Sequence, residues 1–331
     1  MSSVVLIDGK NIAYRHLYTH GGLSHEGFPT GVLYGCIAGI CALSKRLPDM
    51  PIVWVWDGPG KTWRHDLDPG SYKTNRAPKD ARMAQVQSDL HKQLPELQGF
   101  LNDIGMRNFE VANLEGDDMV GMLAMAILDD NLFDDVIIHS ADRDFYQFIS
   151  DRVRVLKGLK GGSLEWADPR ELEAEFRISF RKWTLFRAIT GDKSDNIPQV
   201  FDGVGPVTAA EFIKNGINPS LVAFDDHPKK VKIRYGHPFQ IRKKTVDFKG
   251  NWERIHLNYR LSRIVTDHTD ECLSEEVRKA LASLFKGMSY KSFYRKEECL
   301  DDFGWQKMTN FFVKHDMSDL MEKRQLLWRL P

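Results

Sequence analysis

The stretch Val4-Val5-Leu6-Ile7-Asp8 decides the expected fold class, because it is an unbroken apolar run that ends at a carboxylate. The runs at 52–57 and 136–142 have the same form, and helical segments separate the three. Phe109–Val111 and Val153–Leu156 are weaker strand candidates. Continuous β-branched runs joined by helices are typical of a parallel sheet with both faces covered. We therefore predict an α/β fold with a mostly parallel central sheet flanked by helices.

The three strand-end acids Asp8, Asp57 and Asp142 are expected to meet at one edge of that sheet. In open α/β sheets the functional crevice lies outside the carboxyl ends of the strands. A single acid at such a place is usually a turn former or a helix N-cap. Three of them together favour a functional site.

Carboxylates also gather at the start of two predicted helices, 119–128 and 145–149. Glu115, Asp117 and Asp118 precede the first helix, and Asp142 and Asp144 precede the second. Acids in a first turn complement the helix dipole, but that explains one or two per helix and not three within four residues. Without cations, so many carboxylates in one place would repel one another. Magnesium or manganese ions accept carboxylate oxygens as ligands, and two such ions about 4 Å apart can stabilise both reacting oxygens of a phosphodiester.

Two further motifs follow in the second half of the chain. The segment Gly191–Pro198 adds the carboxylates Asp192 and Asp195. Gly203-Val204-Gly205-Pro206 then precedes a helix predicted over 211–215. Two glycines around an apolar residue before a helix can form a backbone amide cradle for a phosphate, although the same pattern also closes ordinary helix hairpins.

Length and composition are those of a soluble protein with a substantial core. The chain has 331 residues, with 42% apolar and 11% aromatic residues, which predicts two domains or one domain with a satellite. The apolar runs are too short to span a bilayer, and no signal peptide is expected. Four scattered cysteines form no zinc or disulfide pattern. A cytoplasmic protein with reduced thiols is therefore expected.

Charge is unevenly distributed along the chain, although 46 basic and 46 acidic residues balance. Residues 1–224 carry a net charge of −6 and residues 225–331 a net charge of +6, with +9 in 229–263 alone. Such a basic stripe is either a solvated surface or a contact for a phosphate backbone.

The motifs occur in an order that resembles the 5′-nuclease family. That family comprises the 5′→3′ exonuclease domain of bacterial DNA polymerase I, stand-alone phage 5′-exonucleases and flap endonucleases. The resemblance is carried by seven motifs: Asp8; Asp57; Tyr72-Lys73-Thr74-Asn75-Arg76; Glu115-x-Asp117-Asp118; Asp142-x-Asp144; Gly191-Asp192-x-x-Asp195-Asn196-Ile197-Pro198; and G-V-G-x-x-T-A at 203–209. It covers about residues 4–215 well and weakens towards 283. With no polymerase segment behind it, the chain resembles a stand-alone, phage-type member.

The resemblance implies a domain organisation and two metal sites. The expected parts are a resolvase/PIN-like 5′-nuclease core at 1–165 with a helical arch at about 72–105, a helical DNA-binding subdomain at 166–283, and a helical tail at 284–331. The DNA-binding subdomain would contain a helix–three-turn–helix at about 191–215 and a basic insert at 229–249. The first of two Mg²⁺ ions, for which Mn²⁺ can substitute, would be held mainly by Asp8, Asp57, Glu115 and Asp117. Asp118 would lie between the sites, and the second ion would be held by Asp142, Asp144, Asp192 and Asp195. A metal-bound water would be the nucleophile, which makes Asp8 and Asp57 part of the catalytic set.

The resemblance also implies DNA contacts. Lys73 and Arg76, at the foot of the arch, would clamp the scissile phosphate, and Tyr72 would stack on a nearby base. The further predicted contacts are Arg15, Gly203, Gly205, Thr208, Arg242, Lys243 and Lys244. Backbone carbonyls that would hold a K⁺ ion are those of Ile189, Thr190, Pro198, Val200 and Val204. At this point the chain departs from the family, with Gln199 in place of a glycine and one extra residue before Gly203.

The implied function is a structure-specific 5′→3′ exonuclease and flap endonuclease in DNA replication or repair. Its partners would be DNA with a 5′ flap or a 5′ end, or an RNA·DNA hybrid, and it would act as a monomer. Two alternatives remain open: a PIN-like ribonuclease, and a DNA-binding protein of the same fold without activity. The tail at 284–331 either packs on the body or meets a replication protein.

Overall fold

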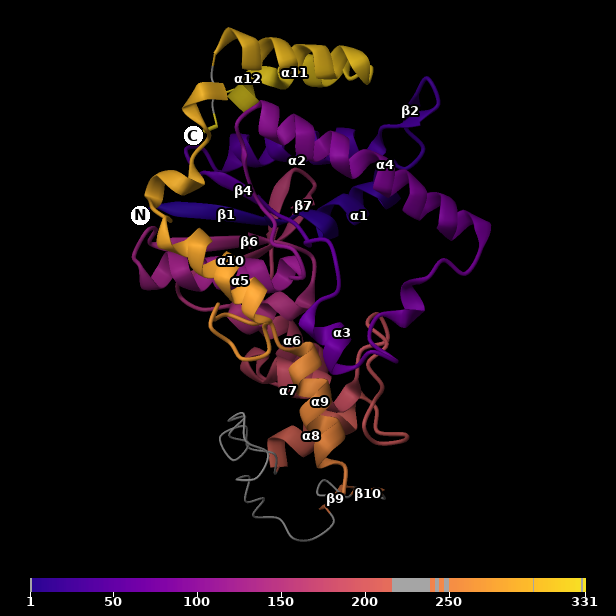
Figure 1. Cartoon of the computed structure of the whole chain (residues 1–331). Coiled ribbons are helices and arrows are strands. Elements are labelled where there is room, and N and C mark those ends of the chain that lie inside the picture. The colour runs from indigo at the N-terminus through magenta and orange to yellow at the C-terminus, as the bar shows by residue number, and fades with distance from the viewer. Residues whose placement is uncertain (1, 216–238, 242–243, 247–249, 300, 329) are drawn as a thin grey trace.

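A central six-stranded sheet organises the part of the chain that the computed structural model describes, which is 2–215, 239–241, 244–246, 250–299, 301–328 and 330–331 (Figure 1). Its strand order is β5–β4–β1–β6–β7–β8, where the first five strands are parallel and β8 is antiparallel to β7. The strands are β1 (Ser3–Asp8), β4 (Ile52–Val55), β5 (Arg107–Phe109), β6 (Asp135–His139), β7 (Val153–Lys160) and β8 (Ser163–Trp166). The predicted α/β fold with a mostly parallel sheet is confirmed. β5 lies two residues earlier than predicted, and β8 was not predicted.

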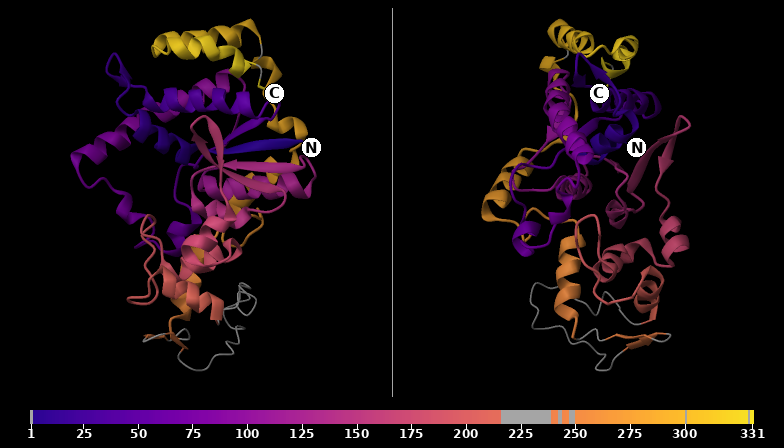
Figure 2. Two further views of the ribbon diagram at one scale, coloured as in Figure 1. Left: turned by 180° about the vertical axis from the view of Figure 1, so that it is seen from behind. Right: turned by 90° about the vertical axis from the view of Figure 1, so that its right-hand side faces the viewer.

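The apolar runs form strands because both faces of the sheet are buried. Val4 and Leu6 of β1 belong to one hydrophobic cluster, and Val5 and Ile7 belong to another on the opposite face. Each fully buried side chain of this size stabilises the fold by roughly 1.5–3 kcal/mol. Helices cover the two faces, as both views of Figure 2 show.

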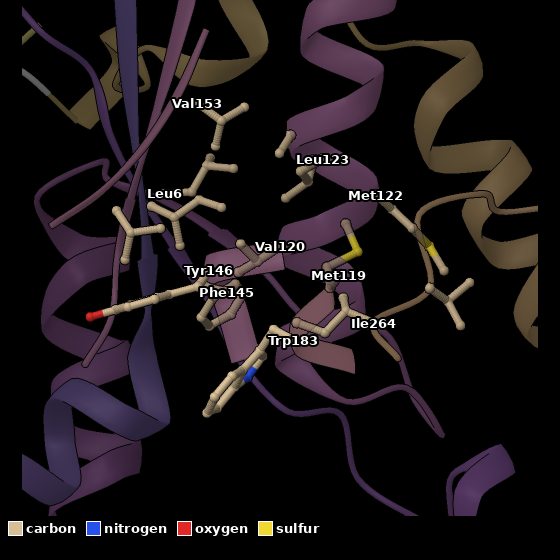
Figure 3. Close-up of a cluster of buried hydrophobic side chains, with 14 of the residues drawn as sticks. Leu6, Met119, Val120, Met122, Leu123, Phe145, Tyr146, Val153, Trp183 and Ile264 are labelled. Atoms are coloured by element: carbon tan, nitrogen blue, oxygen red, sulfur yellow. The ribbon is translucent and has the colours of Figure 1, made fainter. Parts of the chain in front are cut away.

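The helix α5 (Gly116–Asp129) covers the first face and α1 (Gly9–His20), α2 (Gly31–Arg46) and part of α4 (Ala81–Asp103) cover the second. In Figure 3, Leu6 of the sheet faces Val120 and Leu123 of α5. α5 begins three residues before the predicted helix, so its first turn contains the acids Asp117 and Asp118. A small hairpin of β2 (Ser24–His25) and β3 (Phe28–Pro29) connects α1 with α2.

The predicted arch at 72–105 projects only in its first part. It consists of the short helix η1 (Thr74–Arg76) and the long helix α4, and α3 (Trp63–Leu67) precedes it. Residues of α4 are buried from Leu90 onward, where Leu97 and Phe100 pack on the core. Figure 1 shows the other end of α4 extending away from the sheet. The helical arch that the resemblance implies at about 72–105 therefore extends too far, because the second half of α4 packs on the core.

Helices dominate the described residues after 166, as the resemblance implies, and the exception among them is one pair of strands. The helix η2 (Arg143–Phe148) precedes this part of the chain. The helices within it are α6 (Pro169–Phe176), η3 (Phe180–Lys182), α7 (Trp183–Thr190), α8 (Pro206–Asn215) and α9 (Trp252–Ser262). The exception is an antiparallel pair, β9 (Phe239–Ile241) and β10 (Lys244–Val246). Lys244 therefore begins a strand, whereas Arg242 and Lys243 lie outside the described residues. α8 begins five residues before the predicted helix, because Pro206 suits the first helical turn.

The C-terminal segments pack on the body. They are α10 (Glu275–Lys286), η5 (Tyr290–Phe293), η6 (Glu297–Cys299), α11 (Asp302–Lys314) and α12 (Ser318–Trp328). Phe312 and Leu320 join the hydrophobic cluster of α2 and α4, and the rings of Phe100 and Phe311 lie 4.4 Å apart. The packing interpretation of this tail is confirmed. Within the described ranges, no helix is both long and apolar enough to cross a membrane.

Candidate metal centre

Asp8 and Asp57 are held at the carboxyl edge of the sheet by donors from neighbouring elements. Asp8 ends β1 and accepts hydrogen bonds from the backbone N–H of Asn11 at 3.2 Å and the hydroxyl of Ser140 at 2.9 Å. Asp57 follows β4 by two residues and accepts from the backbone N–H of Gly116 at 2.7 Å. That N–H belongs to the first turn of α5, where the helix dipole favours a negative charge. The two acids are thereby fixed relative to each other and to α5.

Among the four acids predicted to hold the first ion, Asp8, Asp57, Glu115 and Asp117, Glu115 accepts the most hydrogen bonds. It precedes α5, and its carboxylate accepts from Thr62 Oγ1 at 2.9 Å, Tyr72 Oη at 3.0 Å and Lys73 Nζ at 2.7 Å. Nearby Arg64 and Lys73 more than offset its burial and hold the pKa of Glu115 at about 2. Glu115 therefore stays ionised and ties the arch foot to α5.

The second group of acids surrounds the start of η2. Asp142 caps η2 and accepts from the backbone N–H of Asp144 at 2.9 Å, and Asp144 accepts from Trp183 Nε1 at 2.9 Å. Asp192 accepts from both the backbone N–H and the hydroxyl of Ser194 and pairs with Arg187. Asp195 pairs with Arg76 of the arch foot.

The loop that carries Asp192 and Asp195 is joined to the arch foot by backbone and side-chain hydrogen bonds. The backbone N–H of Lys73 donates to the carbonyl of Asp195 at 2.8 Å. Asn196 Nδ2 donates to the carbonyl of Ser71 at 2.9 Å, and Ser71 Oγ donates to the carbonyl of Asn196 at 3.0 Å. The arch foot is therefore positioned by the second group of acids as well as by Glu115.

The two acid groups carry more negative charge than the protein offsets. Burial, the largest cause, and the neighbouring acids Asp142 and Asp57 raise the pKa of Asp8 to about 7. Burial and the charge of Asp142 raise the pKa of Asp144 to about 7, and the pKa of Asp117 is also raised, chiefly by burial. Oxygen donors whose ionisation is this costly suit a hard divalent cation, because its charge removes the repulsion. The donor set therefore fits the predicted metal ions.

Basic side chains pair with the acids in this structure. Lys10 pairs with Asp57, Lys73 with Glu115, Arg76 with Asp195, and Arg187 with Asp192. Within the described part of the chain, no three acidic, histidine or cysteine side chains are already grouped around one point for an ion. The ligand roles of Asp8, Asp57, Glu115, Asp117, Asp142, Asp144, Asp192 and Asp195 stay predictions.

The structure does not support a metal-ligand role for Asp118. Its side chain is fully buried, and both of its oxygens already accept hydrogen bonds from Arg64. Trp63 Nε1 and the backbone N–H of Val265 donate to the same carboxylate, each at 2.9 Å. Adjacent residues in a helical first turn point in different directions, which is why Asp117 and Asp118 differ.

The predicted stacking role of Tyr72 also disagrees with the structure. The side chain is 3% exposed and its ring meets that of His65 edge-on. Its hydroxyl donates to Glu115, so the ring supports the acids and offers no face to a base.

The remaining predicted DNA contacts lie at separate places. Arg15 of α1 donates to the carbonyl of Lys157 in β7. Gly203 has a φ of 65°, which a glycine adopts without strain, and Gly205 and Thr208 lie around the start of α8. Of the five carbonyls predicted to hold K⁺, that of Ile189 accepts from the backbone N–H of Val200 and that of Pro198 from Asn258.

Sequence reasoning missed three basic residues at the site: Lys10, Arg64 and Arg187. Lys10 lies two residues after Asp8, in the first turn of α1, and Arg64 follows the second strand-end acid by seven residues. Arg187 lies five residues before Asp192 at the end of α7. Proximity to the motif acids was the available signal, but it does not tell which acid a long side chain reaches.

Comparison with known proteins agrees with this geometry. The family model described as "5'-3' exonuclease, N-terminal resolvase-like domain" matches residues 3–177. The chain belongs to the 5′–3′ exonuclease family.

Relatives of this 5′–3′ exonuclease family member include polymerases and a stand-alone protein. The chain is 31% identical over 265 residues to a thermostable DNA polymerase I of Thermus filiformis. The aligned residues cover 80% of the chain and 29% of the polymerase. The chain thus spans less than a third of that relative. It is 27% identical over 296 residues to a 5′-3′ exonuclease of Buchnera aphidicola subsp. Schizaphis graminum, covering 87% of the chain and 96% of that protein.

The fold of this family member resembles solved structures from bacteriophage T5. A T5 flap endonuclease in a pseudo-enzyme–product complex with DNA and metal ions superposes with a TM-score of 0.61 at 18% identity, covering 93% of this chain and 99% of that one. T5 5′-exonuclease with bound zinc ions gives a TM-score of 0.57 at 16% identity, with 94% and 98% coverage. At these identities the likeness concerns the fold.

The raised pKa of Asp8 predicts that the metal-free protein has a pH-dependent free energy of unfolding. Its pKa is higher in the folded state than in the unfolded state, so the folded state binds more protons between pH 4 and 7 and loses stability as the pH rises through that range. The variant Asp8→Asn keeps an acceptor for Asn11 and removes the charge. We expect it to be more stable than wild type by on the order of 2 kcal/mol at pH 8, with no gain at pH 4. Urea unfolding in EDTA measures this.

The exposed Asp151→Asn serves as the control and is expected to leave unfolding unchanged at both pH values. A variant Asp8→Asn that is no more stable than wild type at pH 8 contradicts the expected charge imbalance.

Lys10 is predicted to compete with a divalent ion for Asp57. Its Nζ lies 2.6 Å from Asp57 Oδ2, and its side chain is 40% exposed. Removing this charge with Lys10→Ala is expected to tighten Mn²⁺ binding in the absence of DNA by about two- to fivefold, corresponding to roughly 0.5–1 kcal/mol for a part-exposed pair. Isothermal titration calorimetry measures the dissociation constant. The exposed Lys45→Ala is the matched control, and equal affinities for both variants contradict the competition.

Proposed function

We propose that this chain is a magnesium-dependent 5′→3′ exonuclease and flap endonuclease that hydrolyses DNA phosphodiesters near a 5′ end or a single-strand/double-strand junction. The observation that carries the proposal is that the two basic residues of the arch foot reach both predicted sets of metal ligands. Lys73 pairs with Glu115 of the first set, and Arg76 pairs with Asp195 of the second. The family match and the raised pKa values of Asp8 and Asp144 support it.

Two Mg²⁺ ions, with Mn²⁺ as a substitute, would supply charge neutralisation and an activated water in this centre. Asp8, Asp57, Glu115 and Asp117 would hold the first, and Asp142, Asp144, Asp192 and Asp195 the second. Asp118 is left out of this ligand set, because its oxygens are occupied.

The arch foot would bind the scissile phosphate. The two cations pair with acids of different predicted metal sites. Lys73 pairs with Glu115, and Arg76 pairs with Asp195. A phosphate that enters between them exchanges these carboxylate pairs for charge-assisted hydrogen bonds to its own oxygens. In that position the two cations offset negative charge that develops during cleavage.

The segment at 191–215 would hold the duplex beyond the cut. The start of α8 presents backbone N–H groups, and a helix N-terminus attracts a phosphate. Gly203, Gly205 and Thr208 would lie along the DNA backbone, with Arg15 and Lys244 as further contacts. A K⁺ ion on the carbonyls of this segment, and RNA in RNA·DNA hybrids as a second substrate, belong to the same proposal.

The setting of the proposed activity is replication or repair in the cytoplasm, or in the host cytoplasm if the gene is carried by a phage. The T5 flap endonuclease structure that resembles this chain contains DNA, which supports DNA as the substrate class. We propose a monomer with the three parts 1–165, 166–283 and 284–331. The exposed side of the packed tail would be where a replication protein binds.

A 5′-flap substrate with and without Mg²⁺ tests the proposed activity. We expect short 5′ products only with the metal, and Asp144→Asn should abolish them. Binding of the substrate without cleavage under any metal condition would instead support a DNA-binding protein without activity. Cleavage of single-stranded RNA in preference to the flap would support the PIN-like ribonuclease.

Lys73 is predicted to act on the cleavage step. Lys73→Ala should lower the single-turnover rate about 10²- to 10³-fold, because it removes a donor that faces developing charge. The matched control is Lys79→Ala, which removes an exposed lysine from the same segment and is expected to keep the rate within about threefold of wild type. Equal rates for the two variants would remove Lys73 from the mechanism.

A further inference from the structure

Arg64 is a buried cation whose donors are all used within the protein. Its side chain is 2% exposed and forms a two-pronged pair with Asp118, at 2.7 and 2.8 Å. Its remaining donors reach the carbonyl of Leu261 at 3.0 Å, the carbonyl of Arg263 at 2.6 Å and Glu115 at 3.3 Å. A guanidinium offers five N–H donors, and these contacts occupy them. Arg64 therefore joins α3, α5 and the segment Leu261–Val265.

The segment Leu261–Val265 is also fixed by Asp118 and by Gln147 of η2. Its Val265 N–H donates to Asp118 at 2.9 Å, and its Ile264 N–H donates to Gln147 of η2 at 3.2 Å. Gln147 in turn donates to the carbonyl of Asp144 at 2.6 Å. The segment thus bridges α5, which follows Glu115 and contains Asp117 in its first turn, and η2, which carries Asp144.

The close fit of this segment against α5 depends on Gly121. A Cβ at that position would lie 2.8 Å from Ile264 Cγ2 and 3.1 Å from the carbonyl of Val265. Both distances are shorter than ordinary van der Waals contact, so the backbone of the segment approaches α5 as closely as packing permits.

The helix α9, which ends at this segment, extends the connection to the loop of Asp192 and Asp195. Asn258 of α9 is fully buried, and its Nδ2 donates to the carbonyls of Ala188 at 3.0 Å and Pro198 at 2.7 Å. These two residues stand on either side of the loop. One continuous stretch, from Asn258 to Val265, therefore contacts α5, η2 and the residues on either side of the loop of Asp192 and Asp195.

We infer that Asp118 and Arg64 are positioning residues that lock the segment Leu261–Val265 in place and so set the spacing between the two acid groups. The inference rests on the proposed two-ion function and removes Asp118 from the metal ligands. A buried ion pair costs much desolvation and adds little net stability compared with an apolar pair, whereas it fixes one geometry when all its hydrogen bonds are made. Here that geometry is the position of α9 and the segment Leu261–Val265 relative to α5.

The test uses Mn²⁺ binding to the full chain, followed by electron paramagnetic resonance, together with the melting temperature of the metal-free protein. Wild type should bind two Mn²⁺ ions that give an exchange-coupled spectrum. Asp117→Asn, the adjacent acid, should lose one ion or bind it more than tenfold more weakly while its metal-free melting temperature stays unchanged or rises. Asp118→Asn should bind two ions with affinities within about threefold of wild type, but melt at a clearly lower temperature and lose the coupled spectrum.

A second variant keeps the inference open to refutation if Asp118→Asn does not fold. The pair Arg64→Met with Asp118→Asn removes both buried charges, which proteins tolerate better than removal of one. It should fold and bind two Mn²⁺ ions without the coupled spectrum. Loss of one ion in either variant at an unchanged melting temperature makes Asp118 a ligand and overturns the inference, as does a wild-type coupled spectrum in the double variant. A wild-type protein that binds no Mn²⁺ pair contradicts the proposed two-ion function instead.

Discussion

Repulsion among carboxylates gathered at one edge of the sheet is the constraint on which the rest of this structure depends. The parallel strands bring Asp8, Asp57 and Asp142 to the same edge, and the first turns of α5 and η2 add more acids. Burial raises the cost further, as the pKa of about 7 for Asp8 shows. The chain offsets part of this charge with basic side chains from α1, α3, the arch foot and α7. The helices α1, α3 and α7 also pack on the core through apolar side chains, and the ion pairs add a second, charge-dependent connection to the sheet edge.

Much of the fold could be predicted from the sequence, because the strands are buried on both faces and read as unbroken apolar runs. The runs at Val4, Ile52 and Val136 became β1, β4 and β6. The prediction failed where tertiary contacts decide the structure. The second half of α4 has a partial apolar face that a sequence cannot match to its partners, which are α1, α2 and the tail, the last more than 200 residues away. The β9–β10 pair failed for another reason, since its short segments lie in a basic stripe with no strand-like apolar run.

The candidate site could be predicted as a set of acids but not as a network. Acids at strand ends and in first turns are visible in the sequence, and motif order separated Asp142 and Asp144 from the rest. Which acid faces the centre and which faces away depends on the helix rotation. Asp117 and Asp118 are adjacent in sequence, yet their surroundings differ. The pKa of Asp117 is raised beside the other acids, whereas both oxygens of Asp118 accept hydrogen bonds from Arg64. The cations Lys10 and Arg187 were missed because a long flexible side chain can reach several partners, and the sequence does not choose among them.

The arch foot connects the two sets of predicted metal ligands. Tyr72 and Lys73 both contact Glu115, whereas Arg76 contacts Asp195, so five residues of chain join the two acid groups. The backbone bond from Lys73 to Asp195 and the bonds between Ser71 and Asn196 are independent of side-chain charge, and they keep the foot in place when the ion pairs break. A cation or a phosphate that displaces Lys73 and Arg76 from their carboxylates therefore changes side chains at the foot without detaching it. The segment from there to Asp80 is exposed and leads into the projecting end of α4. Fixed attachment at 71–76 with exchangeable ion pairs is what a site needs if it is to admit a charged strand and keep its acids in register.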